Sequence, residues 1–217
     1  MFRRSTDTVN AGDSRGSPWL KPSVGQTTPI EGTMFILRHG ETVWNVLGRM
    51  QGGLDSPLTE RGRAQAVRQG EILRAAGAAS LPVYCSPQGR ALETAKLALP
   101  EVRPITDARL AEVAMGDWQG LGYDDILRAA PDAGANPGSF LWKFSAPRGE
   151  RLEEMQARVA SFLAAVPAAS IVVTHGVTSQ LLRGAILGLS IEETDLLDDR
   201  QGVVYRAREG RVDMLER

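Results

Sequence analysis

Two short apolar runs in this chain each lead into a histidine that is followed by glycine. The first run, at 34–37, precedes His39, and the second, at 171–174, precedes His175; the chain has no other histidine. An apolar run of this length, ended by glycine and followed by a helical pattern, is typical of a buried parallel strand that is followed by a loop. In open α/β sheets, ligands bind beyond the carboxyl ends of such strands. The sequence therefore predicts two imidazoles at one sheet edge, and Arg38 beside the first indicates chemistry on an anion.

Strand and helix patterns alternate along the chain from residue 34 onward. Strands are expected at 34–38, 81–85, 102–106 and 170–174, helices at 59–76, 88–97, 152–166 and 177–187, and a hairpin at 203–208 and 211–215. Thr59 is the expected N-cap of the first helix, and Gly77 ends it. Strands interleaved with helices predict an α/β fold, a three-layer α/β/α sandwich with a mostly parallel sheet and an antiparallel edge.

Composition limits the class of protein and its partners. The chain has 217 residues, 42% of them hydrophobic, and a formal net charge of −1, so one domain without a nucleic-acid-binding face is expected. The single cysteine, Cys85, excludes an internal disulfide framework and a cysteine-based zinc site, and fits a reducing compartment. No apolar stretch approaches the ~18 residues of a membrane span. We expect a cytoplasmic protein without a membrane partner, either a monomer or a homodimer.

Residues 1–32 differ in composition from the rest of the chain. They are rich in Ser, Thr, Gly and Pro and lack apolar periodicity, so we expect a disordered extension followed by one domain over 33–217. The segment also lacks the apolar run of a secretory signal. Because Met34 opens the first strand, translation starting there is an alternative. A chain beginning at Met34 is expected to match the full chain in a denaturant titration and an activity assay, and loss of either property would contradict this.

The stretch 119–149 is less regular than its surroundings. It has a short helical pattern near 123–130, several Pro and Gly residues, and three alternating aromatic residues, Phe140, Trp142 and Phe144. A long insertion of this kind in an α/β domain is often a lid over an active site. The alternative is a surface loop that its aromatic residues anchor in a small satellite core.

The residue types around the two histidines suit phosphate chemistry. Arg38 carries a planar, permanently charged fork that fits phosphate oxygens, and Gly40 allows a ligand to approach the backbone. Arg90 falls in the first turn of the helix after the second strand, where backbone N–H groups and the helix dipole favour anions. Three sheet-edge loops are therefore expected to bring both arginines and both histidines together.

The two histidines belong to a longer ordered pattern. Its blocks are R-H-G-E-T-V-W-N at 38–45, G-R-M-Q-G at 48–52, D-S-P-L-T-E-R-G at 55–62, S-P-Q-G-R-A-L-E-T-A at 86–95, L-A-E-V-A-M-G-D-W-Q-G at 110–120 and V-T-H-G at 173–176. In these blocks the chain resembles the histidine phosphatase superfamily, also called the phosphoglycerate-mutase-like family, and the resemblance covers essentially residues 34–217. The resemblance implies the fold of that family.

The resemblance also implies a phosphomonoester hydrolase that uses neither a metal ion nor a cofactor. It implies that His39 is the nucleophile and forms a phosphohistidine, which water then hydrolyses. Arg38, Arg90 and His175 would surround the transferring group and stabilise its charge. Glu112 matches the family's general acid, which protonates the leaving alcohol and later activates water. The residues at the family's substrate-contact positions are Arg38, Asn45, Gln51, Gly52, Arg90 and Gly176.

Other chemistries fit the sequence less well. A cysteine phosphatase needs a longer spacing than the four residues that separate Cys85 from Arg90, and Pro87 removes one of the required N–H donors. A metal site is compatible with the residue types, but neither histidine has a paired H-x-x-x-H spacing. A Walker or kinase-like phosphate loop is absent from the sequence. A catalytically silent binding protein on the same fold is an alternative from a different class, which the intact catalytic set disfavours.

Within the family, the segment after Glu112 favours a phosphatase over a mutase. Cofactor-dependent mutases carry a block of Glu-Arg-His-Tyr-Gly character there, whereas this chain has V-A-M-G-D-W at 113–118. Phosphoglycerate mutase activity stays open as the alternative.

The substrate is expected to be a small phosphorylated metabolite. Either the aromatic residues within 140–144 form an apolar wall for a bulky alcohol, or Lys143, Arg148 and Arg151 bind a second acidic group.

Overall fold

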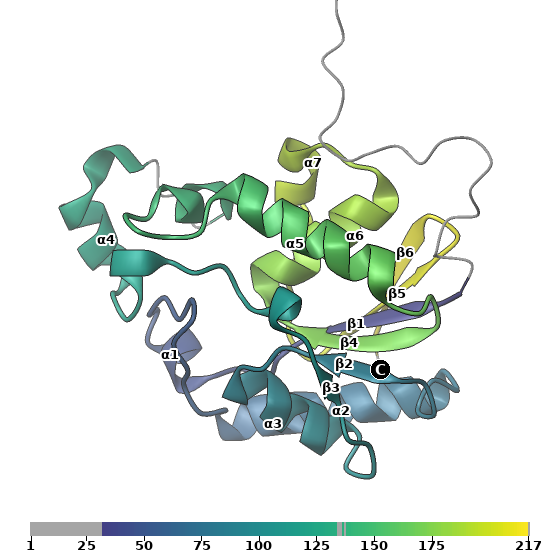
Figure 1. Cartoon of the computed structure of the whole chain (residues 1–217). Coiled ribbons are helices and arrows are strands. Elements are labelled where there is room, and N and C mark those ends of the chain that lie inside the picture. Colours follow the sequence, from purple (N-terminus) through teal and green to yellow (C-terminus); the bar gives the residue numbers. More distant parts are fainter. Residues whose placement is uncertain (1–31, 134–135, 137, 217) are drawn as a thin grey trace, which may run out of the picture.

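The described part of the chain is built around a mixed sheet of six strands with helices on both faces (Figure 1). The computed structural model describes residues 32–133, 136 and 138–216, so nearly all of the extension expected at 1–32 lies outside it. In spatial order the strands are β3 (Ile105–Thr106), β2 (Val83–Cys85), β4 (Ser170–Thr174), β1 (Met34–Arg38), β5 (Val204–Arg208) and β6 (Arg211–Leu215). The first four are parallel, whereas β5 is antiparallel to β1 and forms a hairpin with β6.

Helices on both faces complete three layers and confirm the predicted α/β/α sandwich. On one face lie α2 (Glu60–Ala75) and α3 (Gly89–Ala98), and on the other lie α5 (Leu152–Ala165), α6 (Gly176–Leu187) and α7 (Ile191–Asp195) (Figure 1). Strand β1 serves both sides, since Phe35 and Leu37 pack in the cluster with α2 and α3, while Met34 and Ile36 pack in the cluster with α5 and α6. Burial on both faces explains the uninterrupted apolar sequence of the strand.

The predicted strands and long helices are all present, although two strands start later than predicted and the short helices α1 (Val43–Val46) and α7 were not predicted. The strands expected at 81–85 and 102–106 begin at Val83 and Ile105, in each case directly after a proline. Proline has no N–H group to donate to a ladder, so pairing starts after it. The four long helices end within one residue of the predicted bounds, and the Thr59 hydroxyl caps α2 as expected.

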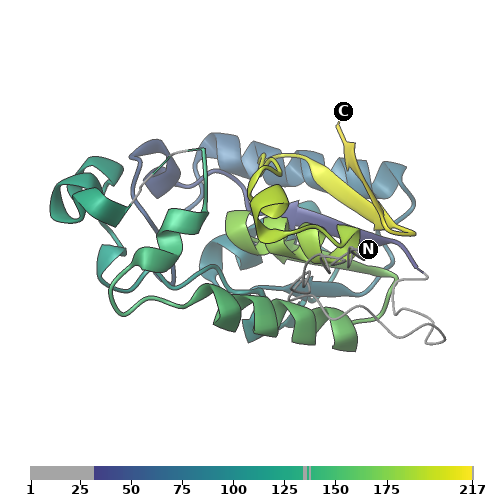
Figure 2. The ribbon, with the colours of Figure 1, turned by 90° about the horizontal axis from the view of Figure 1, so that it is seen from above.

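The carboxyl ends of the parallel strands face one end of the molecule. The same end carries α1 (Val43–Val46) and α4 (Tyr123–Ala129), as both views show (Figures 1 and 2). The register of the two central parallel strands pairs Arg38 with Thr174. A histidine follows each of these residues, so the two histidines leave the sheet side by side.

The irregular segment 119–149 packs against the main core. Trp142 is buried, and its ring centroid lies 5.8 Å from that of Trp118. Phe140 is also buried, with the ring of Phe144 at 6.2 Å. These side chains belong to the same apolar cluster as the inner residues of α5 and α6. The satellite core considered above is therefore wrong in one respect, because the aromatic residues extend the main core instead of forming one of their own.

Candidate active site

A cavity of about 170 Å³ at the carboxyl edge of the sheet gathers most of the predicted site residues. Those that line it are Arg38, His39, Asn45, Gln51, Gly52, Arg90 and Glu112. His175 is fully buried beside them, with its ring centroid 5.2 Å from that of His39. The structure thus brings together every residue predicted to be catalytic, whereas Gly176 lies outside the lining that the described residues form.

A backbone carbonyl fixes the tautomer of His39. Nδ1 of this ring lies 2.8 Å from the carbonyl oxygen of Gly40, and because a carbonyl can only accept, Nδ1 carries the proton. Burial, together with the positive charges of Arg38 and Arg90, holds the pKa of His39 well below its usual value of 6.5. The ring is therefore neutral with a lone pair on Nε2, which is the form that a nucleophile requires.

Arg38 is held by Asp199, which lies on the loop before β5. Nη1 of Arg38 donates to the carbonyl of Asp199 at 2.6 Å and pairs with its carboxylate. A Cβ at Gly176 would lie 2.9 Å from Oδ2 of Asp199 and 3.4 Å from Cζ of Arg38. Gly176 therefore acts by leaving room for this ion pair at the start of α6.

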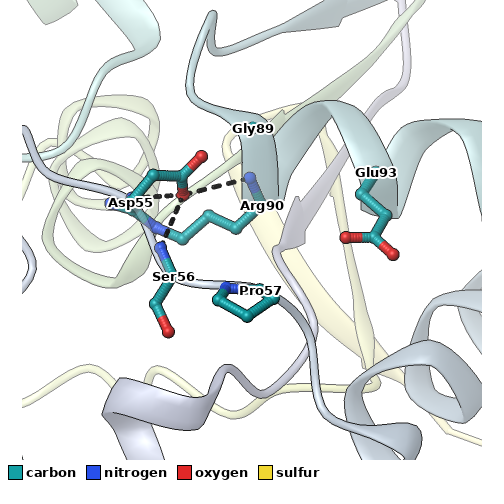
Figure 3. Close-up of a pocket in the computed structure, with 6 residues that line it drawn as sticks. All are labelled: Asp55, Ser56, Pro57, Gly89, Arg90 and Glu93. Atoms are coloured by element: carbon teal, nitrogen blue, oxygen red, sulfur yellow. Dashed lines mark hydrogen bonds and ion pairs between the residues drawn. The ribbon is translucent and has the colours of Figure 1, made fainter.

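Arg90 is buried to 1% exposure, and the loop over 52–55 holds its guanidinium. Nη1 donates to the carbonyl of Leu54 at 2.7 Å, and Nη2 donates to that of Gly52 at 3.1 Å. Asp55 accepts two further hydrogen bonds, from Nη1 at 3.1 Å and from the backbone N–H of Arg90 at 3.2 Å (Figure 3). The φ of +53° at Gly52 lies in the left-handed region that favours glycine, so this loop shape depends on that residue.

His175 is bonded to Ser86, the residue that directly follows β2. Its Nε2 lies 2.7 Å from the Ser86 hydroxyl oxygen, and its Nδ1 has no hydrogen-bond partner among the described residues. Burial, together with the positive charge of Arg90, holds the pKa of His175 well below its usual value. The Ser86 hydroxyl also lies 3.4 Å from Oε1 of Gln88, so it can either donate to Nε2 or accept from it, and Nδ1 is the ring atom left for a ligand.

Three buried nitrogen atoms at this site have no hydrogen-bond partner among the described residues. They are Nε of Arg38, Nε of Arg90 and Nδ1 of His175. An unpaired buried donor costs roughly 1–3 kcal/mol, so such atoms are rare and call for a functional explanation. Two of the three belong to permanently charged guanidinium groups. The set suits an anion with several acceptor oxygens, such as a phosphoryl group.

Glu112 lies on the loop after the short 3₁₀ turn Ala108–Leu110, and it faces the cavity beside the start of α6. Its carboxylate accepts hydrogen bonds from the backbone N–H groups of Val177 and Thr178, both at 3.3 Å, and from the Thr178 hydroxyl at 3.2 Å. The backbone N–H of Glu112 donates to Oε1 of Gln88 at 2.9 Å, which fixes the loop itself. A helix N-terminus favours a negative group, so these contacts orient the carboxylate at the cavity wall.

Asn45 and Gln51 add amide groups to the cavity. Oδ1 of Asn45 accepts from the N–H and the hydroxyl of Thr42, both at 3.0 Å, and from Nε2 of Gln201 at 3.2 Å. Its acceptor is thus fully used, and its NH₂ group is left to donate. Gln51 is buried, and its Oε1 has no partner among the described residues. Both side chains therefore have hydrogen-bonding groups left for a substrate.

Four supporting residues were not predicted from the sequence. Asp199 and Asp55 pair with the two arginines, Ser86 contacts His175, and Gln201 donates to the carbonyl of His39 at 3.1 Å. Asp55 and Ser86 stand inside the sequence blocks that carry the family resemblance, which was a usable signal. Asp199 and Gln201 stand outside every block, far along the chain from their partners.

The structure separates the three cations considered for a second acidic group. Lys143 lines the cavity, whereas the side chains of Arg148 and Arg151 are 82% and 73% exposed and pair with acidic neighbours. Phe140 and Trp142 are buried in the main core and lie outside the lining of this cavity by the described residues. An apolar wall formed by these two rings is therefore wrong.

Cys85 cannot supply a nucleophile at this site. Its thiol is buried, and burial raises its pKa to about 12, so the reactive thiolate is disfavoured.

Within the described residues, no group of three or more His, Cys, Asp or Glu side chains is placed to hold a metal ion. The helices of that same part of the chain include none with the length and apolar character of a membrane span.

The two buried histidines predict a pH-dependent stability. Burial holds both pKa values well below 6.5, so the unfolded chain takes up protons at a pH where the folded protein does not. The free energy of unfolding should therefore fall as the pH drops below about 6.5, by up to ~1.4 kcal/mol per pH unit for each histidine. Urea titrations at about pH 7 and about pH 5.5 measure this change. A His175→Asn variant should show about half the slope, and a slope of zero in the unmodified protein would contradict the expectation.

Comparison with known proteins assigns the chain to a family. The profile of the histidine phosphatase superfamily (branch 1) matches residues 34–209. The acid phosphatase of Mycobacterium tuberculosis is 37% identical over 131 residues, which are 60% of this chain and 61% of that protein. The probable phosphoglycerate mutase GpmB of Proteus mirabilis is 35% identical over 173 residues, covering 72% of this chain and 75% of that protein.

A solved structure agrees with this assignment. Bacillus stearothermophilus YhfR superposes with a TM-score of 0.70 and 34% sequence identity, over 84% of this chain and 98% of that one. The chain belongs to the histidine phosphatase superfamily and has a phosphoglycerate-mutase-like fold. The relatives named above are an acid phosphatase and a probable phosphoglycerate mutase, so proteins similar to this one carry the names of both enzyme classes.

Proposed function

We propose that the protein hydrolyses phosphate monoesters of small metabolites through a phosphohistidine on His39, without a metal ion. The observation that carries the proposal is the neutral His39 ring, whose Nδ1–H is bonded to the Gly40 carbonyl while Nε2 keeps its lone pair. The two arginines that line this cavity and the buried His175 beside His39 each keep a nitrogen atom without a partner among the described residues. A nucleophile and an anion site in one cavity are the two parts that phosphoryl transfer needs.

The reaction then proceeds in two displacements. Nε2 of His39 attacks phosphorus, the bond from phosphorus to the alcohol oxygen breaks, and Glu112 gives that oxygen a proton. In the second step, the Glu112 carboxylate takes a proton from water, whose oxygen attacks phosphorus and releases the histidine. The donors of Arg38, Arg90 and His175 stabilise the charge on the equatorial oxygens in both steps.

The size of the cavity supports a small substrate. Its volume of about 170 Å³ is below the roughly 300–1,000 Å³ typical of pockets for drug-sized ligands. The similarity to an acid phosphatase supports hydrolysis, and we place the enzyme in the cytoplasm as a monomer or homodimer that binds a small phosphorylated molecule. The buried, reduced Cys85 agrees with that compartment.

A screen for phosphate release from a panel of phosphorylated metabolites and p-nitrophenyl phosphate tests the proposal. We expect turnover that a chelator leaves unchanged, and an acid-labile phosphoenzyme when labelled substrate is quenched with denaturant. The absence of turnover on every ester would favour a binding protein on this fold. Turnover that a chelator abolishes would contradict the metal-independent reaction.

A mutase is the second candidate, because the similarity to GpmB covers 72% of this chain. A mutase must protect the phosphohistidine from water while the substrate changes its orientation in the site. Incubation with 3-phosphoglycerate separates the reactions, since a mutase yields 2-phosphoglycerate and a phosphatase yields free phosphate. We expect free phosphate as the main product.

Replacing Asp55 by alanine is expected to lower kcat/KM about 10- to 100-fold, the range for a lost hydrogen bond to a charged group. The reason is that this carboxylate fixes both the guanidinium and the backbone N–H of Arg90. Steady-state kinetics with p-nitrophenyl phosphate measure the loss.

Glu93 provides the matched control for that variant. It lines the same surface pocket as Asp55 but pairs with Arg63, and Figure 3 shows it apart from the contacts of Arg90. Glu93→Ala should leave kcat/KM within about twofold. Equal losses in the two variants would mean that Asp55 has no specific part in positioning Arg90.

A further inference from the structure

Two cations on the wall of the catalytic cavity have no part in the mechanism above. They are Lys143 and Arg49. The other two cations of the lining, Arg38 and Arg90, each pair with an aspartate. Lys143 and Arg49, in contrast, form no ion pair with the part of the chain that the structure describes. Two of the four lining cations are therefore without a paired carboxylate among the described residues.

Local hydrogen bonding places the backbone of Lys143 at the cavity wall. It lies in the short 3₁₀ turn Leu141–Ser145, next to the buried Trp142, and its backbone N–H donates to the carbonyl of Phe140 at 3.0 Å. Burial lowers the pKa of its ammonium group, an effect that the carboxylate of Glu112 opposes. A half-buried ammonium without a partner is unfavourable, because it has lost water contacts without gaining an acceptor. An anion brought by the substrate would supply that acceptor.

Arg49 reaches the cavity from a different part of the chain. Its backbone N–H donates to the carbonyl of Trp44 at 2.9 Å, and it forms an isolated antiparallel bridge with Gly122. The residue thus lies between α1 and the start of α4, whereas Lys143 follows α4. Four cations and one carboxylate, Glu112, line the cavity. Asp199 and Asp55 pair with Arg38 and Arg90, so Lys143 and Arg49 are the lining cations left to meet a negative group of the substrate.

We propose that Lys143 and Arg49 form a second anion-binding site beside the phosphoryl site, so that the preferred substrate is a phosphate monoester with another acidic group. This inference rests on the proposed phosphatase function and narrows its substrate class. A carboxylate and a second phosphate offer the same chemistry, a compact negative group with acceptor oxygens for an ammonium and a guanidinium. A flexible lysine suits a point-like anion, and the arginine fork adds direction.

The test compares esters that differ in the second group alone. 3-Phosphoglycerate and glycerol 3-phosphate differ by a carboxylate in place of a hydroxymethyl group, and fructose 1,6-bisphosphate and fructose 6-phosphate differ by one phosphate. We expect the enzyme to release phosphate with a higher kcat/KM from the more acidic member of at least one pair. The pair that shows the preference identifies the second anion as a carboxylate or a phosphate.

Lys143→Met removes the charge while keeping most of the side-chain length. It should lower kcat/KM on the preferred acidic ester by about 10- to 100-fold, the range for one charge-assisted hydrogen bond, and leave the less acidic ester within about twofold. Lys143→Arg should recover part of the loss, and Arg49→Gln should reduce the same preference. Arg151→Gln, which changes an exposed cation at the start of α5 that pairs with Glu154, is the control and should change neither ester.

Three results would overturn the inference. An equal loss on both members of a pair in Lys143→Met would assign the ammonium to the phosphoryl group or to stability. Hydrolysis of all the esters without a preference for acidic ones would contradict the second site and leave the proposed phosphatase function intact. A lack of turnover on every ester, p-nitrophenyl phosphate included, would overturn the phosphatase function and this inference with it.

Discussion

Replacing His39 by alanine is expected to lower phosphate release from p-nitrophenyl phosphate by a factor on the order of 10⁴ or more, the scale of losses when a nucleophile is removed. The proposed reaction passes through a bond from Nε2 of this ring to phosphorus, and alanine offers no atom that could replace it. The unpaired donors of Arg38 and Arg90 remain, so inorganic phosphate should still bind. Steady-state kinetics and isothermal titration with phosphate measure the two properties separately.

The other histidine supplies a control of the same residue type. His175→Ala removes a donor of the anion site but keeps the nucleophile, so labelled substrate should still form an acid-labile phosphoenzyme, more slowly. His39→Ala should form none. Activity that survives in His39→Ala would contradict the assignment of the nucleophile, and if a chelator then abolished that activity, a metal site would replace it.

The fold was predictable because apolar runs report burial directly. Residues 34–37 and 171–173 are apolar at every position, which a strand covered on both faces requires, and the structure buries all of them. The packing of segment 119–149 was not predictable, since Phe140, Trp142 and Phe144 show that aromatic side chains are buried somewhere but not against which surface. Contacts between distant segments decide that question.

Some residues of the candidate site were predictable from the sequence, and others were not. Arg38, His39 and Glu112 stand in blocks whose residue types and order resemble a family, so their positions could be predicted before any geometry was known. Asp199 could not be found, because a lone aspartate far from any block has the appearance of a surface residue. The sequence could not show that Lys143 lies at the cavity, because Arg148 and Arg151 occur in the same stretch and only the fold decides which of the three cations lines it.

Replacing Glu112 by glutamine is expected to lower kcat on glycerol 3-phosphate by about 10²- to 10⁴-fold, the usual contribution of general acid–base catalysis. An alkoxide leaves poorly unless it is protonated, and an amide has no proton of suitable acidity to give. p-Nitrophenolate leaves without a proton, so the first step with p-nitrophenyl phosphate should be affected much less. The same carboxylate activates water in the second step, so the phosphoenzyme should accumulate and produce a burst of p-nitrophenol before a slow steady state.

Glu41 is the matched control for Glu112, because it is a carboxylate within the first sequence block that lies outside the lining of the cavity by the described residues. It accepts a hydrogen bond from the Thr59 hydroxyl at 2.8 Å and pairs with Arg61. Glu41→Gln should therefore show neither the burst nor the difference between the two esters. Equal losses on both esters in Glu112→Gln, without a burst, would mean that Glu112 orients the start of α6 and leaves proton transfer to another group. The dependence on the leaving group thus separates a carboxylate that moves a proton from one that only holds the site together.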